Sequence, residues 1–282
     1  NTVEDEVASP IDIWDLNTFD PELMALLKAN EKLIRDYTKE ENRIFLGYDL
    51  GRDPTLHLRP SNRHWDSNHE LEKLLTEKMA ERSIRAFHYT RLTESEIQKL
   101  RSEGIHLSTQ TSLKERLAGQ VAEGVFSDEI ASRLYSLSPL LNGQEDNRSG
   151  MFWLSALPVT VDDRGVEGLL SHWGGEVVYM WLEDPSLIEL VQSIGKKAVI
   201  EVCVPLFATK HAFSAAQAVI ETFARSLKLH PENKAFDVYV KSNLPSKVIL
   251  GIHKEGEECF RKLGNGYPAS YQKIDDIWWD ED

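Results

Sequence analysis

Hydrophobic residues recur at helical spacing in the first third of the chain. Residues 21–37 and 70–82 carry leucine, isoleucine and methionine on one side of a 3.6-residue repeat, so we expect two amphipathic helices there. The first begins directly after Asp20 with a proline, a common residue at a helix start. Residues 44–66 are interrupted by glycine and proline and predict loops with a short apolar piece at 44–48.

A strand, a helix and a further extended segment follow one another closely after residue 83. Residues 84–90 alternate between apolar and polar side chains and predict a strand that ends in polar groups. Thr93 and Glu96 have the spacing of a capping box, which predicts a helix over 94–102 that ends at Gly104. A strand that turns directly into a helix aims its last side chains at a cleft.

The rest of the chain is richer in strand patterns. Helices are expected over 109–135 and 213–227, and a polar loop over 142–150. Extended segments are expected at 105–108, 151–157, 176–182, 198–205, 235–240 and 248–253. Because helices lead and strands dominate afterwards, the predicted fold class is α+β.

The composition narrows the class of protein. The chain has 282 residues, of which 41% are hydrophobic and 28% are charged, as expected of a globular protein with a sizeable core. It contains no run of 18 apolar residues, so we expect no membrane span. The two cysteines, Cys203 and Cys259, are too few for a disulfide framework, which favours a cytoplasmic setting.

The net charge of −14 is concentrated at the two ends. Residues 1–22 carry seven acidic and no basic side chains, and residues 255–282 carry eight acidic and three basic ones. The body between them has 31 acidic and 29 basic side chains, so an anionic ligand is compatible with it. We expect the acidic ends to keep the protein soluble, to contact a basic protein partner, or to cover a cleft of the same chain.

Residues 87–108, FHYTRLTESEIQKLRSEGIHLS, resemble the opening of the ADP-ribosyltransferase fold, most of all that of the DarT-like toxins that modify DNA. The resemblance implies a split β-sheet core with NAD as a substrate. It also implies that His88, Tyr89 and Thr90 hold the nicotinamide ribose.

Two later segments are similar to the same superfamily. Residues 170–179 look like its turn from a helix end into a strand, where Trp173 would stack on a flat ring and Glu176 would face the cleft. Residues 234–245 look like its late strand, which carries a catalytic glutamate, but Asp237 stands near that position here.

The missing glutamate leaves several possibilities open. Asp237 serves in its place with a shorter reach, or Glu176 or Glu201 takes the role, or the transferase chemistry is lost. A carboxylate is required because cleavage of the nicotinamide bond develops positive charge on the ribose.

Further residues are candidates for the cofactor. The resemblance assigns Arg116 to the pyrophosphate, with Arg85 and Arg91 as less specific alternatives, and Ser155 to a contact with NAD. The histidines at 57, 64 and 69 match no zinc-binding spacing, so no metal is expected.

The sequence thus predicts a helical N-terminal extension over 1–80, an ADP-ribosyltransferase-like domain over 81–256 and an acidic, Trp-containing tail over 257–282. The expected function is an NAD-dependent mono-ADP-ribosyltransferase-like toxin or phage-defence effector that modifies nucleic acid or protein. The alternatives are a non-catalytic acidic binding protein on the same scaffold and an NAD glycohydrolase.

Overall fold

The computed structural model describes residues 9–47, 60–232 and 235–264, and their fold is of the expected α+β class. His57 and the Trp-containing end of the tail lie outside these ranges. The chain divides into two compact units. Among the described residues, those up to 85 and those between 205 and 236 form the first unit, and those from 86 to 204 and from 237 onward form the second.

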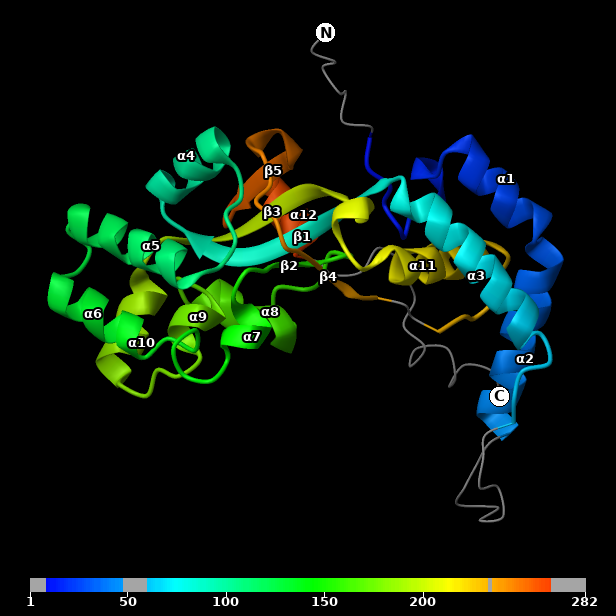
Figure 1. Cartoon of the computed structure of the whole chain (residues 1–282), viewed down its shortest axis with the longest axis horizontal. Coiled ribbons are helices and arrows are strands. Elements are labelled where there is room, and N and C mark those ends of the chain that lie inside the picture. Colours follow the sequence, from blue (N-terminus) through cyan, green and yellow to red (C-terminus); the bar gives the residue numbers. More distant parts are fainter. Residues whose placement is uncertain (1–8, 48–59, 233–234, 265–282) are drawn as a thin grey trace, which may run out of the picture. The chain divides into compact units, whose positions relative to one another are not determined.

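Helices build the first unit. They are α1 (Pro21–Ala29), α2 (Glu31–Gly47), α3 (Trp65–Ala80) and α11 (Ala212–Ser226), with two short turns, η1 (Leu16–Thr18) and η2 (Leu206–Ala208). Helix α11 packs against α3 and α2 (Figure 1). Its buried face is almost entirely alanine, valine, isoleucine and phenylalanine, which allows close helix packing. The predicted extension over 1–80 therefore shares its unit with a helix from much later in the chain.

The acidic N-terminal segment is part of this unit as far as the structure describes it. Ile11 forms a parallel bridge with Ile84, and Ile13 is fully buried. Asp20 receives hydrogen bonds from the Arg82 guanidinium, which is the main reason that its pKa falls to about 2. The acids that the structure describes in this segment therefore take part in pairs and caps of the fold, and their expected role toward solvent, a basic partner or a cleft stays a prediction.

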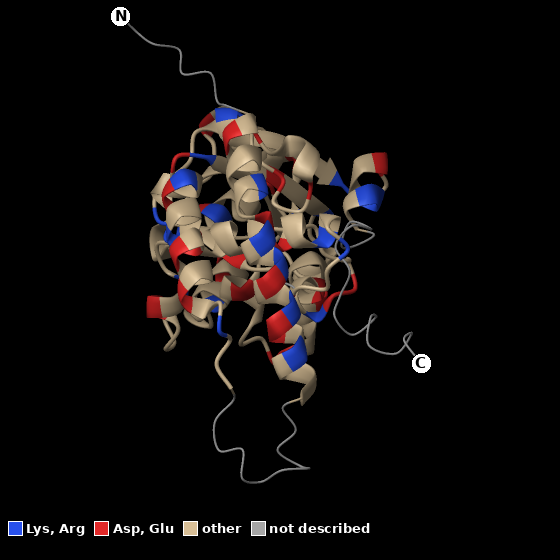
Figure 2. Ribbon diagram, turned by 90° about the vertical axis from the view of Figure 1, so that its right-hand side faces the viewer, with Lys and Arg blue, Asp and Glu red and all other residues tan. Residues whose placement is uncertain are grey.

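Acidic and basic positions are interspersed over the helices that face the viewer in Figure 2 instead of gathering by sign. Many of them pair one helical turn apart, as Lys32 does with Asp36 and Arg35 with Glu31. Such exposed pairs each stabilise a helix by only about 0.2–0.5 kcal/mol.

A five-stranded sheet runs through the second unit in the order β4-β2-β1-β3-β5 (Figure 1). Its strands are β1 (Ser83–Leu92), β2 (Phe152–Ser155), β3 (Lys196–Pro205), β4 (Asp237–Val240) and β5 (Ile249–Lys254). The pattern of apolar and polar residues predicts each of these strands to within a few residues. The described strands form one sheet, whereas the resemblance implies a split one.

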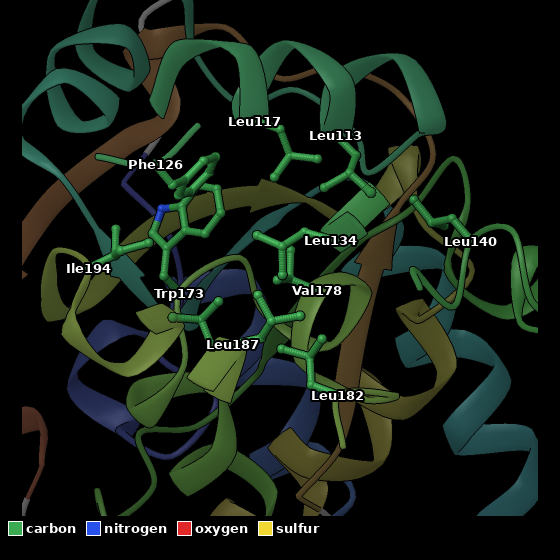
Figure 3. Packing of buried hydrophobic residues seen from close by; sticks show 11 residues of the cluster. Leu113, Leu117, Phe126, Leu134, Leu140, Trp173, Val178, Leu182, Leu187 and Ile194 are labelled. Carbon is green, nitrogen blue, oxygen red and sulfur yellow. The ribbon is translucent and has the colours of Figure 1, made fainter. Parts of the chain in front are cut away.

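Short helices surround this sheet. They are α4 (Glu94–Glu103), α5 (Gln110–Ala122), α6 (Asp128–Ser136), α7 (Glu145–Arg148), α8 (Arg164–Ser171), α9 (Glu176–Tyr179), α10 (Pro185–Ser193), η3 (Ser246–Val248) and α12 (Glu258–Leu263). Side chains from α5, α6, α9 and α10 point toward one another around Trp173 (Figure 3). Among the described residues, no helix is both long and apolar enough to cross a membrane.

The structure corrects three local expectations. Residues 176–182 are not a strand, because α9 begins at Glu176. The helix expected over 21–37 is interrupted at Asn30, which ends α1. Helix α2 then continues through residues 44–47, expected as a loop, because Ile44 is buried and the first glycine of the helix is its last residue, Gly47.

The predicted capping box at the start of α4 is confirmed. The Thr93 hydroxyl accepts from the Glu96 backbone N–H, and the Glu96 carboxylate accepts from the Thr93 backbone N–H at 2.8 Å. The helix ends at Gly104, whose φ of 90° lies in the region that favours glycine. A Cβ at this position would come within 2.2 Å of the Leu244 carbonyl oxygen. Gly104 therefore permits both the turn and the close approach of the strand-like segment at Leu244.

We predict that Gly104→Ala lowers the free energy of unfolding by about 3 kcal/mol, from backbone strain and overpacking together. Gly124→Ala is the matched control, because Gly124 also has a positive φ but open space around it. It should cost about 1 kcal/mol. Urea unfolding followed by circular dichroism measures both, and equal losses would refute the close-approach explanation.

Candidate functional site

A cavity of about 860 Å³ opens within the second unit, in the size range of ligand sites. Its walls come from β1, β2, α4, α5, α7 and the turn that precedes α9. The predicted site residues that line it are His88, Tyr89, Thr90, Arg116, Ser155, Glu176 and Asp237. The fold therefore brings together residues that are up to 149 positions apart, from His88 to Asp237.

His88 lies half-buried on β1 with its ring against Phe152, the two centroids 4.3 Å apart. Its Nδ1 lies 2.7 Å from the Trp153 carbonyl oxygen. Loss of solvent around the ring is the main reason that the pKa of His88 falls to about 4; the Trp153 bond opposes this shift, and the Arg116 charge adds to it. At neutral pH the ring is uncharged. Because a carbonyl only accepts, Nδ1 carries the proton and Nε2 is a hydrogen-bond acceptor.

The two residues after His88 are more deeply buried. Thr90 is 4% exposed, and among the described residues its hydroxyl has one hydrogen bond, a long one of 3.4 Å to the Arg91 carbonyl. The Tyr89 hydroxyl accepts from the Val159 backbone N–H at 2.7 Å. Tyr89 thus holds the chain after β2, while Thr90 keeps a weakly engaged hydroxyl at the cavity.

Glu96 lines the cavity and is hydrogen-bonded to Trp173 of the hydrophobic core. Its carboxylate accepts from the Trp173 indole N–H at 3.0 and 3.1 Å and from Arg116 Nε. Burial alone would raise the pKa of Glu96, but the Arg116 charge and these hydrogen bonds outweigh it, so the pKa is lowered. Glu96 therefore stays ionised beside the cavity.

Trp173 is fully buried and is not among the described residues that line the cavity. Phe126 meets its ring edge-on, and the Arg116 guanidinium lies 4.7 Å from the ring centroid. This corrects the expectation that Trp173 stacks on a ligand, because the indole has no exposed face. Apolar packing and its hydrogen bond to Glu96 account for its position.

Arg116 is already engaged on two sides. Besides Glu96, it donates from one terminal nitrogen to the Arg91 carbonyl at 3.3 Å. Its other terminal nitrogen has no hydrogen-bond partner among the described residues. Arg116 can therefore offer one donor to a ligand without giving up its structural bonds.

Glu176 enters the cavity from a glycine turn. Gly174 and Gly175 have φ values of 89° and 67°, and a Cβ on Gly174 would lie 2.2 Å from a Val178 methyl. The turn starts α9, which directs Val178 into the core and leaves Glu176 at the cavity. Burial of Val178 thus outweighs the strand propensity of the Val-Val-Tyr sequence.

A salt bridge orients the Glu176 carboxylate. Arg148 donates from Nε at 3.1 Å and from a terminal nitrogen at 2.9 Å to the same carboxylate oxygen. The Glu176 side chain is 44% exposed, so solvent and a ligand can reach it. Arg148 also lines the cavity and lies in a segment that carries no recognisable sequence motif.

Ser155 and Asp237 lie side by side at the sheet. Ser155 of β2 is in register with Phe87 of β1 and with Asp237 of β4. Asp237 is exposed at the start of an edge strand, within the cavity lining. A carboxylate therefore borders the cavity at the position where the resemblance expects a glutamate.

The alternative candidates for the catalytic carboxylate and for the pyrophosphate-binding arginine lie outside the described cavity lining. Glu201 is 3.6 Å from His253 on the neighbouring strand, and Arg85 pairs with Asp12 at 2.9 Å. Arg91 donates to the carbonyls of Ile194, Gly195 and Leu170, so it fixes the ends of α8 and α10. In the described ranges, none of these three candidates lines the cavity.

Within those same ranges, no group of three or more histidine, cysteine or acidic residues is placed to hold a metal ion. No protein-family model, curated protein or solved structure matches this chain. The chemistry of the cavity residues is therefore the basis for a function.

We predict that the His88 imidazole titrates near pH 4 and has its proton on Nδ1 at pH 7. Because this folded-state pKa lies below the ordinary value of 6.5, its contribution to stability is lost as the pH falls from about 6.5 to 4. NMR of the labelled imidazole measures the pKa and the tautomer. His88→Asn keeps a donor for the Trp153 carbonyl without titrating, so it should flatten the stability loss over that range. A titration at pH 6–7 would contradict the assignment.

Proposed function

We propose that this protein cleaves the nicotinamide–ribose bond of NAD and transfers ADP-ribose to a macromolecule, either nucleic acid or protein. The observation that carries the proposal is that the neutral acceptor His88 and the carboxylate of Glu176 line one cavity. The resemblance of residues 87–108 to the DarT-like group adds the expectation of a toxin or phage-defence effector.

Binding would use the polar groups along β1 and α5. The His88 Nε2 can accept from a ribose hydroxyl, and the weakly engaged Thr90 hydroxyl offers a second contact beside it. The unpartnered terminal nitrogen of Arg116 suits a pyrophosphate oxygen. Ser155 supplies a further hydroxyl from β2.

The proposed reaction breaks the bond between ribose C1′ and the nicotinamide ring nitrogen. Nicotinamide leaves as a neutral base and keeps the bonding electron pair, so positive charge develops on the ribose. The Glu176 carboxylate stabilises this charge. An acceptor nucleophile then forms a new bond to C1′ and gives up its proton to a carboxylate, Glu176 or Asp237.

Arg148 acts as a positioning residue in this scheme. It holds one oxygen of the Glu176 carboxylate and leaves the other without a hydrogen bond among the described residues. A carboxylate fixed in this way can face developing charge without first losing rotational freedom. Asp237, exposed beside Ser155, is the second carboxylate that an acceptor would meet.

We predict that wild-type protein releases nicotinamide from NAD and labels an acceptor when DNA, RNA or cell lysate is present. Glu176→Gln should lower the rate about 100-fold or more, because the neutral amide cannot stabilise the ribose charge. Glu183→Gln is the matched control, since Glu183 is exposed and does not line the cavity. Chromatography of nicotinamide and labelled NAD measure the two products.

The outcomes separate the alternatives. Nicotinamide release without a labelled acceptor would indicate a glycohydrolase. No release with any of the three acceptor sources would refute the enzyme and leave a non-catalytic binding protein. Equal rates for Glu176→Gln and wild type would move the catalytic role to another carboxylate.

A further inference from the structure

Gln120 is a polar residue at a position that otherwise belongs to the core. It follows Leu113 and Leu117 on the buried side of α5, and only 2% of it is exposed. It also lines the cavity, together with its neighbour Gly119. A glutamine on a leucine stripe is unusual, because apolar side chains fill such positions at lower cost.

The side-chain oxygen of Gln120 has no hydrogen-bond partner in the described part of the chain. Its backbone carbonyl is used, because it accepts from the Val125 N–H at 2.9 Å. A buried amide oxygen left unpaired costs about 1–3 kcal/mol. The neighbouring buried polar groups differ, since Glu96 and the Trp173 indole satisfy each other.

Gly119, the residue before Gln120, borders the same cavity. A Cβ added at Gly119 would meet nothing within 4 Å, so this part of α5 presents bare backbone toward open space. At this part of the cavity lining, Gly119 contributes no side chain and Gln120 contributes an amide whose oxygen is unpaired among the described residues.

An amide carries an acceptor oxygen and a donor NH₂ next to each other. It pairs best with a planar edge that presents a donor and an acceptor in the reverse order, as glutamine does with adenine. NAD has two such edges, the amino-substituted edge of adenine and the carboxamide of nicotinamide. Both would satisfy the Gln120 oxygen with an N–H.

We propose that Gln120 is a specificity-determining residue that recognises one of these two N–H-bearing edges of NAD. This inference rests on the proposed function, because it assumes that a dinucleotide occupies the cavity. It adds the residue that selects the base, which neither the resemblance nor the proposed chemistry assigns.

The test measures NAD binding by calorimetry for wild type, Gln120→Leu and the control Gln98→Leu, whose glutamine is exposed on α4 outside the cavity lining. Gln120→Leu should weaken NAD binding about 10-fold or more, which corresponds to one lost hydrogen-bond pair. Gln98→Leu should leave the affinity unchanged. The thermal midpoint of Gln120→Leu should stay the same or rise, because an unpaired buried amide is replaced by an apolar side chain of similar size.

Two analogues identify the edge. Nicotinamide hypoxanthine dinucleotide replaces the adenine amino group by a carbonyl, and 3-acetylpyridine adenine dinucleotide replaces the carboxamide NH₂ by a methyl group. Wild type should bind one of them about 10-fold more weakly than NAD. Gln120→Leu should bind that analogue as tightly as it binds NAD.

Each contrary result has a distinct meaning. If wild type does not bind NAD, the proposed function fails and this inference fails with it. If wild type binds NAD but Gln120→Leu binds it equally well, or if wild type accepts both analogues as well as NAD, only the role of Gln120 is refuted. A fall in the thermal midpoint of Gln120→Leu would show a structural role instead.

Discussion

The buried carboxylate of Glu96 holds the cavity wall together. It accepts hydrogen bonds from the Thr93 backbone, the Arg116 guanidinium and the Trp173 indole, which belong to three separate segments. A charge withdrawn from water is tolerated only when its partners are all in place, and loss of one partner typically costs about 3–5 kcal/mol. The start of α4, the middle of α5 and the turn before α9 are therefore fixed relative to one another within this unit.

The ion pair of Glu176, the carboxylate of the proposed reaction, is more exposed than that of Glu96. Glu176 and Arg148 form a solvent-accessible salt bridge, whose energy is small compared with that of a buried one. His88 on β1 is half-buried, so its exposure lies between that of Glu96 and that of Glu176, and its ring is neutral. The cavity thus has one wall held by a buried charge and another bordered by a solvent-accessible ion pair.

Local signals explain what the sequence could predict. The capping box at Thr93 and Glu96, the helix end at Gly104 and the strand expected over 84–90 each depend on neighbouring residues, and all three are confirmed. The strand expected at 176–182 is wrong because burial of Val178, a tertiary effect, decides the local conformation.

The site itself was only partly predictable, for a related reason. The chemistry of His88, Thr90 and Glu176 could be proposed from short motifs, but the partner of Glu176 could not. Arg148 lies 28 positions away at the end of the short helix α7, in a segment expected as a polar loop, and no periodicity or spacing links the two. Gln120 did leave a signal, a polar residue on an apolar helical stripe, which becomes informative only once the cavity beside it is known.

The division of the first unit into separate stretches of chain has a consequence for biosynthesis. Helices α1, α2 and α3 leave the ribosome long before α11, against which α2 and α3 pack. Until then, α3 can pack against α2 but lacks the helix with which it makes most of its contacts. A nascent chain in that state exposes apolar surface of the kind that chaperones bind. The sheet of the second unit is also completed late, because β4 and β5 follow α11 in the chain.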